Sequence, residues 1–280
     1  RVALPGTRRD LGVVVHQVAA LLVPIRERQV VRGGVLTRIA EGAHINPGWG
    51  PVALSLKVHA KLDRLARDHG ARLVCDNTFA SPALQRPLEL GADVVMHSTT
   101  KYFGGHSDVL GGALVFGRSS DWQARIAHRL HVTGATLAPF NAWLTLRGCR
   151  SLPARMRMHC ANAGAIATFL AAHPAIERVN YPGLSSHPGH AVAASQMSGF
   201  GGMLSVELRG GKYAALAMAG KLKLFTNATS LGGCESLVEH RASVEGAMPV
   251  SPANLLRLSI GLEHQDDLIA DLDQALKEAR

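Results

Sequence analysis

One lysine, Lys101, stands in a sequence context that could support covalent chemistry on a carbonyl compound. It follows a short apolar run, Ala92 to Met96, and is directly preceded by Ser98, Thr99 and Thr100. A lysine in a partly buried, hydroxyl-rich pocket can lose its proton and form a Schiff base with a carbonyl group. The glycines that follow Lys101 would let a ligand approach the backbone closely. Lys101 is therefore the first candidate catalytic residue.

Three further side chains could complete a site around this lysine. The hydroxyls of Ser98 and Thr100 can bind a phosphate group, which a nearby lysine also attracts. Asp76 follows another short apolar run, and a buried carboxylate there could hold a proton on a pyridine nitrogen. An amine, hydroxyls and a carboxylate are the parts that a pyridoxal phosphate site requires. The same pattern also fits a surface lysine between a strand and a glycine turn, so the residues alone leave both interpretations open.

The elements that must position these residues are predicted to form an α/β layer. Apolar positions in 56–69 have helical spacing, and short apolar runs follow, which are typical of buried parallel strands. A helix followed by such strands indicates a mostly parallel sheet, in which ligands bind outside the carboxyl ends of the strands. Asp76 and 98–101 would lie at two such ends. The expected strands are 71–75, 92–96 and 113–116.

The pattern changes after Arg150, and we place a domain boundary there, between a cofactor-binding part (54–150) and an α+β domain (151–280). Pro153 suits the first turn of a long helix over 153–173. The closing segment 266–279 carries apolar residues on one helical face. The expected strands between these helices are Ile176–Tyr181, Gly202–Leu208, Leu222–Thr226 and Leu255–Ile260.

Residues 1–53 remain unassigned. They contain seven arginines, no lysine, and glycines and prolines without a sustained period. The run 13–23 fits either a helix or a buried strand.

The charge of the chain does not indicate nucleic-acid binding, although the net charge is +9 and the isoelectric point is about 9.9. Basic residues are scattered among acidic ones, and only 5% of the residues are aromatic. A nucleic-acid-binding protein would carry a clustered basic patch. We therefore expect no nucleic-acid partner.

Membrane insertion, a disulfide scaffold and a metal site are also not indicated. No stretch of about 18 uncharged apolar residues occurs, which a membrane-spanning helix would need. The four cysteines show no CxxC spacing and are too sparse for a disulfide framework. We expect a protein of the reducing cytoplasm, with no membrane partner and no metal. The cysteines are Cys75, Cys149, Cys160 and Cys234.

Several stretches closely resemble the Cys/Met-metabolism family of pyridoxal phosphate enzymes. This family includes cystathionine γ-synthase, the cystathionine lyases, methionine γ-lyase and the O-acyl-homoserine sulfhydrylases. The likeness covers about residues 54–280 in order. It implies the aspartate aminotransferase-like fold, fold type I, with part of the large domain and the α+β C-terminal domain. The stretches are 75–82, 84–93, 97–108, 139–143, 147–148, 181–184, 199–203, 230–237 and 256–263.

The resemblance implies a role for each candidate residue. Lys101 is similar to the lysine that binds the cofactor covalently and acts as the catalytic base. Asp76 resembles the partner of the pyridine nitrogen, and Ser98 and Thr100 resemble phosphate-binding hydroxyls. The resemblance also implies that two residues bind the substrate. Arg257 resembles the arginine that clamps the α-carboxylate with a bidentate fork, and Ser230 lies in the segment that lines this carboxylate. Ser98 and Thr100 could instead cap a strand end, and Arg257 could serve a structural ion pair.

The family pattern is not recognisable in residues 1–53. Family members carry an arm, a glycine-led phosphate loop and a stacking tyrosine in this region, whereas the first tyrosine here is Tyr102.

The resemblance implies a homo-oligomer, a dimer or tetramer, that acts on a small amino acid. The expected reaction is β- or γ-elimination, or γ-replacement, on sulfur-containing or O-acyl-homoserine substrates. Thr229 stands where family members that perform γ-chemistry on cystathionine often carry a glutamate. This disfavours a cystathionine γ-synthase or γ-lyase and leaves room for a methionine γ-lyase-like or β-lyase-like preference. The alternative is a truncated or frame-shifted fragment that folds and binds the cofactor weakly without catalysis.

Overall fold

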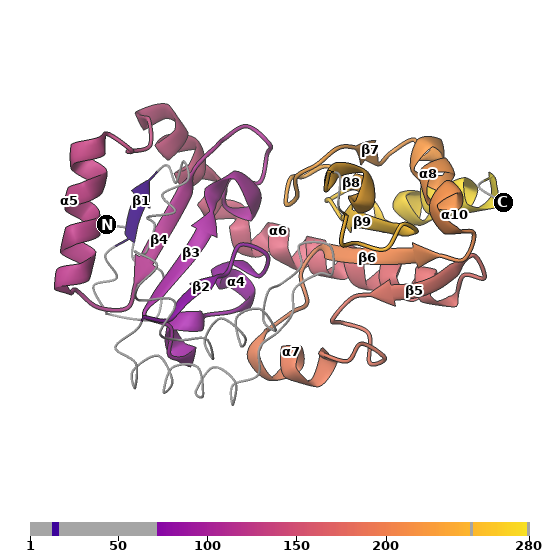
Figure 1. Cartoon of the computed structure of the whole chain (residues 1–280), viewed down its shortest axis with the longest axis horizontal. Helices are drawn as coiled ribbons and strands as arrows, with labels where there is room; N and C mark the ends of the chain where they lie inside the picture. Colours follow the sequence, from indigo (N-terminus) through magenta and orange to yellow (C-terminus); the bar gives the residue numbers. More distant parts are fainter. Residues whose placement is uncertain (1–12, 17–71, 247–248, 279–280) are drawn as a thin grey trace.

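Two β-sheets lie at opposite ends of the long axis of the structure, with one long helix running between them (Figure 1). The computed structural model describes residues 13–16, 72–246 and 249–278. The expected helix over 56–69, and most of the unassigned segment 1–53, lie outside the described residues. None of the described helices is both long enough and apolar enough to cross a membrane.

The N-terminal sheet has the strand order β1-β4-β3-β2. The strands are β1 (Val13–His16), β2 (Val74–Asp76), β3 (Val94–Ser98) and β4 (Gly112–Phe116). Strands β2 and β3 are parallel, whereas β4 is antiparallel to both β3 and β1. Three of the expected strands are present, and 13–16 is a strand rather than a helix. The described part of this sheet is mixed, because β4 follows β3 after a turn and a loop instead of a crossover helix.

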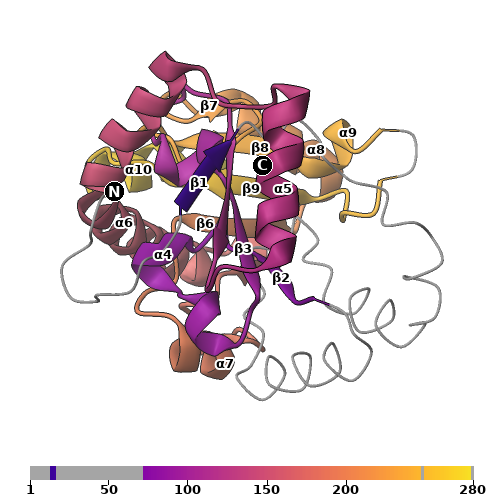
Figure 2. The ribbon, with the colours of Figure 1, turned by 90° about the vertical axis from the view of Figure 1, so that its left-hand side faces the viewer.

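Short helical elements connect these strands. Helix α4 (Ser81–Leu84) and the 3₁₀ turn η2 (Pro87–Leu90) lie between β2 and β3, and the turn η3 (Thr99–Phe103) follows β3 directly. Helix α5 (Asp121–Thr133) begins where the Ser120 hydroxyl accepts a hydrogen bond from the Gln123 amide at 3.2 Å, as an N-cap residue does. Figure 2 shows α5 alongside the sheet.

The longest helix, α6 (Pro139–Ala172), begins fourteen residues before the expected start at Pro153. Pro153 lies inside it, although proline lacks an N–H group for the helical ladder. Tertiary packing compensates, because α6 closes tightly on turn η3 at Gly148. A Cβ atom at Gly148 would lie 2.1 Å from the Phe103 carbonyl oxygen. The proposed domain boundary at 150 therefore falls within a continuous helix.

The C-terminal sheet has the order β5-β6-β9-β8-β7. Its strands are β5 (Ile176–Asn180), β6 (Met203–Leu208), β7 (Thr226–Asn227), β8 (Leu237–His240) and β9 (Leu255–Ser259). Its helices are α7 (His190–Gln196), α8 (Gly211–Lys221), α9 (Arg241–Val244) and α10 (Gln265–Glu278). The expected strands in β5, β6 and β9 and the closing helix are confirmed, whereas β8 was not expected. Residues of α6, α8 and α10 pack with β6, β8 and β9 into one apolar cluster.

The expected strand over 222–226 is wrong except for Thr226. The buried carboxylate of Asp271, on α10, binds the backbone N–H groups of Lys223 and Leu224 at 2.9 and 2.8 Å. It also accepts from the Phe225 N–H at 3.3 Å. These backbone N–H groups therefore donate to the Asp271 side chain rather than to a neighbouring strand, and the segment does not pair as a strand.

We predict that Asp271→Ala lowers the free energy of unfolding by about 2–4 kcal/mol, because three backbone donors lose a charged acceptor. Asp273→Ala, two residues along the same helix, is the control. Asp273 is one-third exposed and pairs with Lys277 on the surface, so its loss should cost less than about 1 kcal/mol. Urea unfolding of both variants measures the difference, and equal losses would contradict the assignment.

Candidate active site

Lys101 lies in turn η3, immediately after the carboxyl end of β3. The turn is wider than an α-helix, because the Gly104 N–H donates to the Thr99 carbonyl, five residues back, at 2.8 Å. Lys101 itself departs from helical geometry, with φ −92° and ψ −130°. Wide turns of this kind are frequent at functional sites. The backbone at the candidate lysine is therefore locally irregular.

The amine of Lys101 contacts a segment more than a hundred residues away in the sequence. Its Nζ donates a hydrogen bond to the Ser230 Oγ at 2.7 Å. Ser230 has a φ of +96°, which is uncommon for a residue with a side chain. Gly232 packs so closely on the turn that a Cβ atom there would lie 2.8 Å from the Tyr102 nitrogen. The structure thus brings two of the sequence-predicted residues, Lys101 and Ser230, into direct contact.

The surroundings of Lys101 favour its neutral amine. Partial burial lowers the pKa of Lys101, and the nearby cation of Arg257 lowers it further, while the carboxylate of Glu239 acts in the opposite direction. Burial and a like charge both disfavour the protonated form of a lysine. A larger fraction of Lys101 is therefore in the neutral, nucleophilic form than for a lysine in water.

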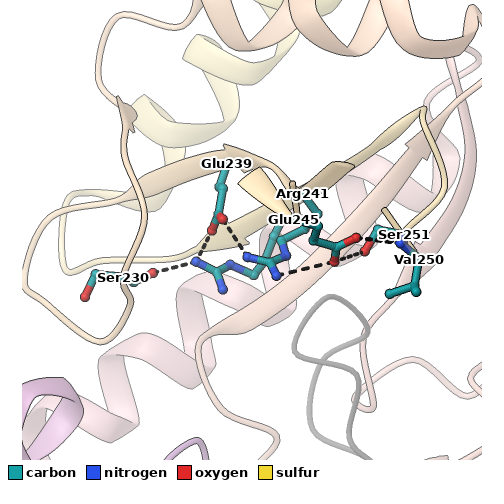
Figure 3. A network of polar contacts seen from close by, with 7 residues as sticks. Ser230, Glu239, Arg241, Glu245, Val250 and Ser251 are labelled. Carbon is teal, nitrogen blue, oxygen red and sulfur yellow. Dashed lines mark hydrogen bonds and ion pairs between the residues drawn. The ribbon is translucent and has the colours of Figure 1, made fainter. Parts of the chain in front are cut away.

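Arg257 lies in β9, and its guanidinium is buried. Its Nη2 donates to the Ser230 carbonyl at 3.0 Å and forms an ion pair with Glu239, on the neighbouring strand β8 (Figure 3). Glu239 also accepts a hydrogen bond from Arg241 at 2.6 Å. The structural ion pair left open by the sequence is present, and the expected role on a substrate carboxylate stays a prediction.

Asp76 lies at the carboxyl end of β2, beside β3, but its side chain is exposed rather than buried as expected. In the described sheet β2 is an edge strand that pairs only with β3, which leaves its other side uncovered by a strand. The Asp76 carboxylate accepts from the Thr78 N–H at 2.9 Å. The Thr78 hydroxyl in turn accepts from the Ser98 N–H at 2.9 Å. The loop after β2 therefore ties Asp76 to the end of β3.

The two candidate phosphate-binding hydroxyls have different surroundings. Thr100 Oγ1 accepts from the Gly111 N–H at 3.1 Å and lies 3.4 Å from the Gly111 carbonyl oxygen. This threonine thus fixes the start of β4 against turn η3. The Ser98 hydroxyl makes no hydrogen bond within the described residues, so it is the freer of the two. The phosphate-binding role of both residues stays a prediction.

The sequence analysis missed Glu239, which is the acidic neighbour of both Lys101 and Arg257. An acidic residue directly after the apolar pair Leu237 and Val238 was the available signal, because buried charges are normally paired. Within the described part of the chain, no group of three or more His, Cys, Asp or Glu side chains could hold a metal ion.

His97, at the end of β3, is buried beside Phe103, with 4.7 Å between ring centroids. Its Nδ1 has no hydrogen-bond partner in the described structure. Burial lowers the pKa of His97 to about 4, and the same cause lowers the pKa of His159 on α6 to about 4.

We therefore predict that the free energy of unfolding decreases as the pH falls from about 6.5 towards about 4. In this window the unfolded chain binds protons at His97 and His159 that the folded chain does not bind. Unfolding curves at pH 7 and pH 5 measure the effect. His97→Gln should reduce this pH dependence, whereas His264→Gln, at an exposed position, should not. An unchanged slope in His97→Gln would show that the pKa of this ring is the same in the folded and the unfolded chain.

Comparison with known proteins supports the resemblance seen in the sequence. Residues 55–277 match the family described as Cys/Met metabolism PLP-dependent enzyme. The cystathionine gamma-synthase of Mycobacterium tuberculosis is 51% identical over 228 residues, which cover 80% of this chain and 58% of the relative. The L-methionine gamma-lyase of Pseudomonas putida is 46% identical over 226 residues, covering 78% of this chain and 57% of the relative.

A solved structure agrees with the fold. The cystathionine gamma synthase of Xanthomonas oryzae pv. oryzae, in complex with cystathionine, matches with a TM-score of 0.75 and 47% identity. The match covers 79% of this chain and 59% of that structure. The chain therefore spans less than two thirds of the length of these relatives. The expected fold and family are confirmed: the chain belongs to the Cys/Met-metabolism family of pyridoxal phosphate-dependent enzymes.

Proposed function

We propose that this chain acts in pyridoxal phosphate-dependent β- or γ-elimination, or γ-replacement, on sulfur-containing or O-acyl-homoserine amino acids. The observation that carries the proposal is the environment of Lys101. Its amine is half-buried, its pKa is lowered, and it lies 2.7 Å from the Ser230 hydroxyl and close to Arg257. This is the environment that a cofactor-binding lysine needs.

The described residues fit pyridoxal phosphate. Lys101 supplies the amine that would bind the cofactor's aldehyde carbon. Ser98 offers a hydroxyl without a partner in the described structure, and Thr100 lies on the same turn. Asp76 provides an exposed carboxylate at the end of the adjacent parallel strand, where it would pair with the pyridine nitrogen. When bound, the cofactor withdraws electrons from the bonds at the substrate's α-carbon.

Each residue then has a defined task in the proposed reaction. The Lys101 amine would accept the proton from the substrate's α-carbon. Ser230 Oγ accepts a hydrogen bond from this amine and so orients it. Arg257 binds the substrate carboxylate, and Asp76 keeps the pyridine nitrogen protonated. The lowered pKa of Lys101 increases the fraction of its amine that is uncharged and can accept this proton.

The substrate class is proposed from the relatives. The Xanthomonas structure holds cystathionine, and the Pseudomonas relative is named a methionine lyase. Both names point to amino acids with sulfur in the side chain. Thr229, which leaves room for a methionine γ-lyase-like or β-lyase-like preference, lies directly before Ser230 and is exposed. The leaving group on the β- or γ-carbon would then be a thiol, or a carboxylate where the substrate is an O-acyl-homoserine.

We also propose a cytoplasmic homo-oligomer. The four cysteines are free, as expected in a reducing compartment. Apolar side chains are exposed at the start of α6 and near it. Phe140 and Trp143 stack with 5.9 Å between ring centroids although both are more than half exposed. Large exposed apolar groups of this kind are typical of protein–protein contacts, and a second copy of the chain is the partner that we propose.

We predict that Lys101→Ala abolishes the visible absorbance of the bound cofactor, because no other amine would hold it at this site. The full chain is incubated with pyridoxal phosphate, freed of unbound cofactor and scanned. Lys212→Ala, which removes an exposed lysine of α8, should keep the wild-type spectrum. Circular dichroism checks that both variants fold. Undiminished absorbance in Lys101→Ala would refute the assignment.

We predict that Asp76→Asn keeps part of the cofactor absorbance but lowers turnover by about 10²–10⁴-fold. A neutral amide does not stabilise the protonated pyridine nitrogen as an anion does. Steady-state rates with cystathionine, methionine and O-acetylhomoserine measure the effect. A variant with wild-type rates would make Asp76 a purely structural residue.

The same assay tests the alternative of a chain that folds and binds the cofactor without catalysis. Ordinary enzymes turn over at about 1 per second or faster. A wild-type rate far below this value on all three substrates, with Lys101-dependent absorbance intact, would favour that alternative.

A further inference from the structure

The polar contacts of Arg257 converge on a single nitrogen atom. Its Nη2 donates to the Ser230 carbonyl at 3.0 Å and forms the ion pair with Glu239. Within the described residues, no hydrogen bond or ion pair involves its Nη1 or Nε atom. The two contacts come from different elements, the 228–236 segment and strand β8.

This arrangement limits how Arg257 could bind a carboxylate. A guanidinium offers two faces for a two-pronged fork, Nη1 with Nη2 and Nε with Nη2. Both faces include Nη2. Nη2 has two N–H groups, and its partners are the Ser230 carbonyl and the Glu239 carboxylate. A ligand carboxylate that binds Arg257 by a fork would therefore have to share Nη2 with one of these partners or displace it, and Glu239 is the partner that carries a competing charge.

Glu239 also forms an ion pair with a second cation, Arg241. Its side chain is 3% exposed, and its Oε1 accepts from Arg241 Nη1 at 2.6 Å. Arg241 in turn contacts Glu245 at 3.4 Å. Glu245 is held by the N–H groups of Val250 and Ser251, both at 2.9 Å, and by the Ser251 hydroxyl at 2.6 Å (Figure 3). The network alternates in charge from Arg257 to Glu245, so Arg241 is held from both sides.

We propose that Glu239 is the resting counter-ion of Arg257, and that a ligand α-carboxylate displaces it from Nη2 onto Arg241. Glu239 then competes with the ligand and sets the affinity of the site for carboxylates, acting as a positioning residue through Arg257. Arg241 makes the exchange possible, because a buried carboxylate without a partner would be strongly unfavourable. The inference rests on the proposed role of Arg257 in binding the substrate carboxylate.

The competition predicts opposite effects for two variants. Glu239→Gln removes the competing charge, so the dissociation constant of a carboxylate ligand should decrease by about tenfold. Arg241→Gln leaves Glu239 with Arg257 as its only cation, so the dissociation constant should increase by a similar factor. Arg241 is partly exposed, so this second variant keeps the proposal testable if Glu239→Gln does not fold.

The probe is L-norleucine, an α-amino acid whose side chain carries no leaving group. Calorimetry measures its binding to the full chain, both with and without added pyridoxal phosphate. Glu207→Gln is the matched control, because Glu207 is a buried acid in the same sheet whose partners are Asn180 and Arg178. This control should bind L-norleucine with the wild-type dissociation constant.

Opposite shifts in Glu239→Gln and Arg241→Gln, with Glu207→Gln unchanged, would support the competition. Weaker or unchanged binding in Glu239→Gln would overturn it, and so would no binding in both wild type and Glu239→Gln. Cofactor absorbance is recorded on the same samples. If the chain shows no Lys101-dependent absorbance but the dissociation constants of the two variants still shift in opposite directions, the proposed function is refuted and this inference stands.

Discussion

The close contact between turn η3 and the segment 230–232 is the constraint on which the candidate site depends. Gly232 lies against the backbone of Tyr102 at a distance that leaves no room for a Cβ atom. This approach brings the Ser230 hydroxyl within 2.7 Å of the Lys101 amine. Without the approach, Lys101 would lie on the N-terminal sheet with no contact to Arg257 and β8. The site is therefore made by packing between two parts of the chain, each of which supplies only half of it.

The same contact creates an electrostatic problem that the structure solves with Glu239. Arg257 is a buried cation close enough to Lys101 to lower the pKa of the lysine. Like charges in a partly desolvated site are unfavourable unless an anion lies between or beside them. Glu239 supplies that anion, and Arg241 and Glu245 extend the alternation of charge away from the site. The balance stabilises the buried Arg257 cation beside Lys101, and a cation at this place suits anionic ligands.

Helices and strands whose formation depends on neighbouring residues were predicted from local patterns in the sequence. The strands that end at Asp76 and Ser98 are marked by short apolar runs, and α10 is marked by its apolar face. The start of α6 was missed because Pro153 reads locally as a first-turn residue, whereas packing of Gly148 on turn η3 keeps the helix continuous. Contacts over long sequence separations, such as the one between Glu239 and Arg257, produce no periodic pattern in the local sequence and so were not predicted. Family resemblance implied the proposed role of Lys101, but it did not indicate that Glu239 is the partner of Arg257.

The continuity of α6 has a geometric consequence for the two sheets. Gly148 meets turn η3, while His159 and Asn162 bond to the carbonyls of 260–263 next to β9. Eleven and fourteen residues separate these contacts from Gly148, close to three and four complete turns of about 3.6 residues, so all three lie on one side of the helix. The length of the helix between Gly148 and the other two residues therefore fixes both the distance and the rotation between these contacts. A single inserted residue between Gly148 and His159 would shift one anchor by about 1.5 Å and rotate it by about 100° relative to the other. Evolution of this chain can therefore vary the loops at either end of the helix far more freely than the length of the helix between its anchors.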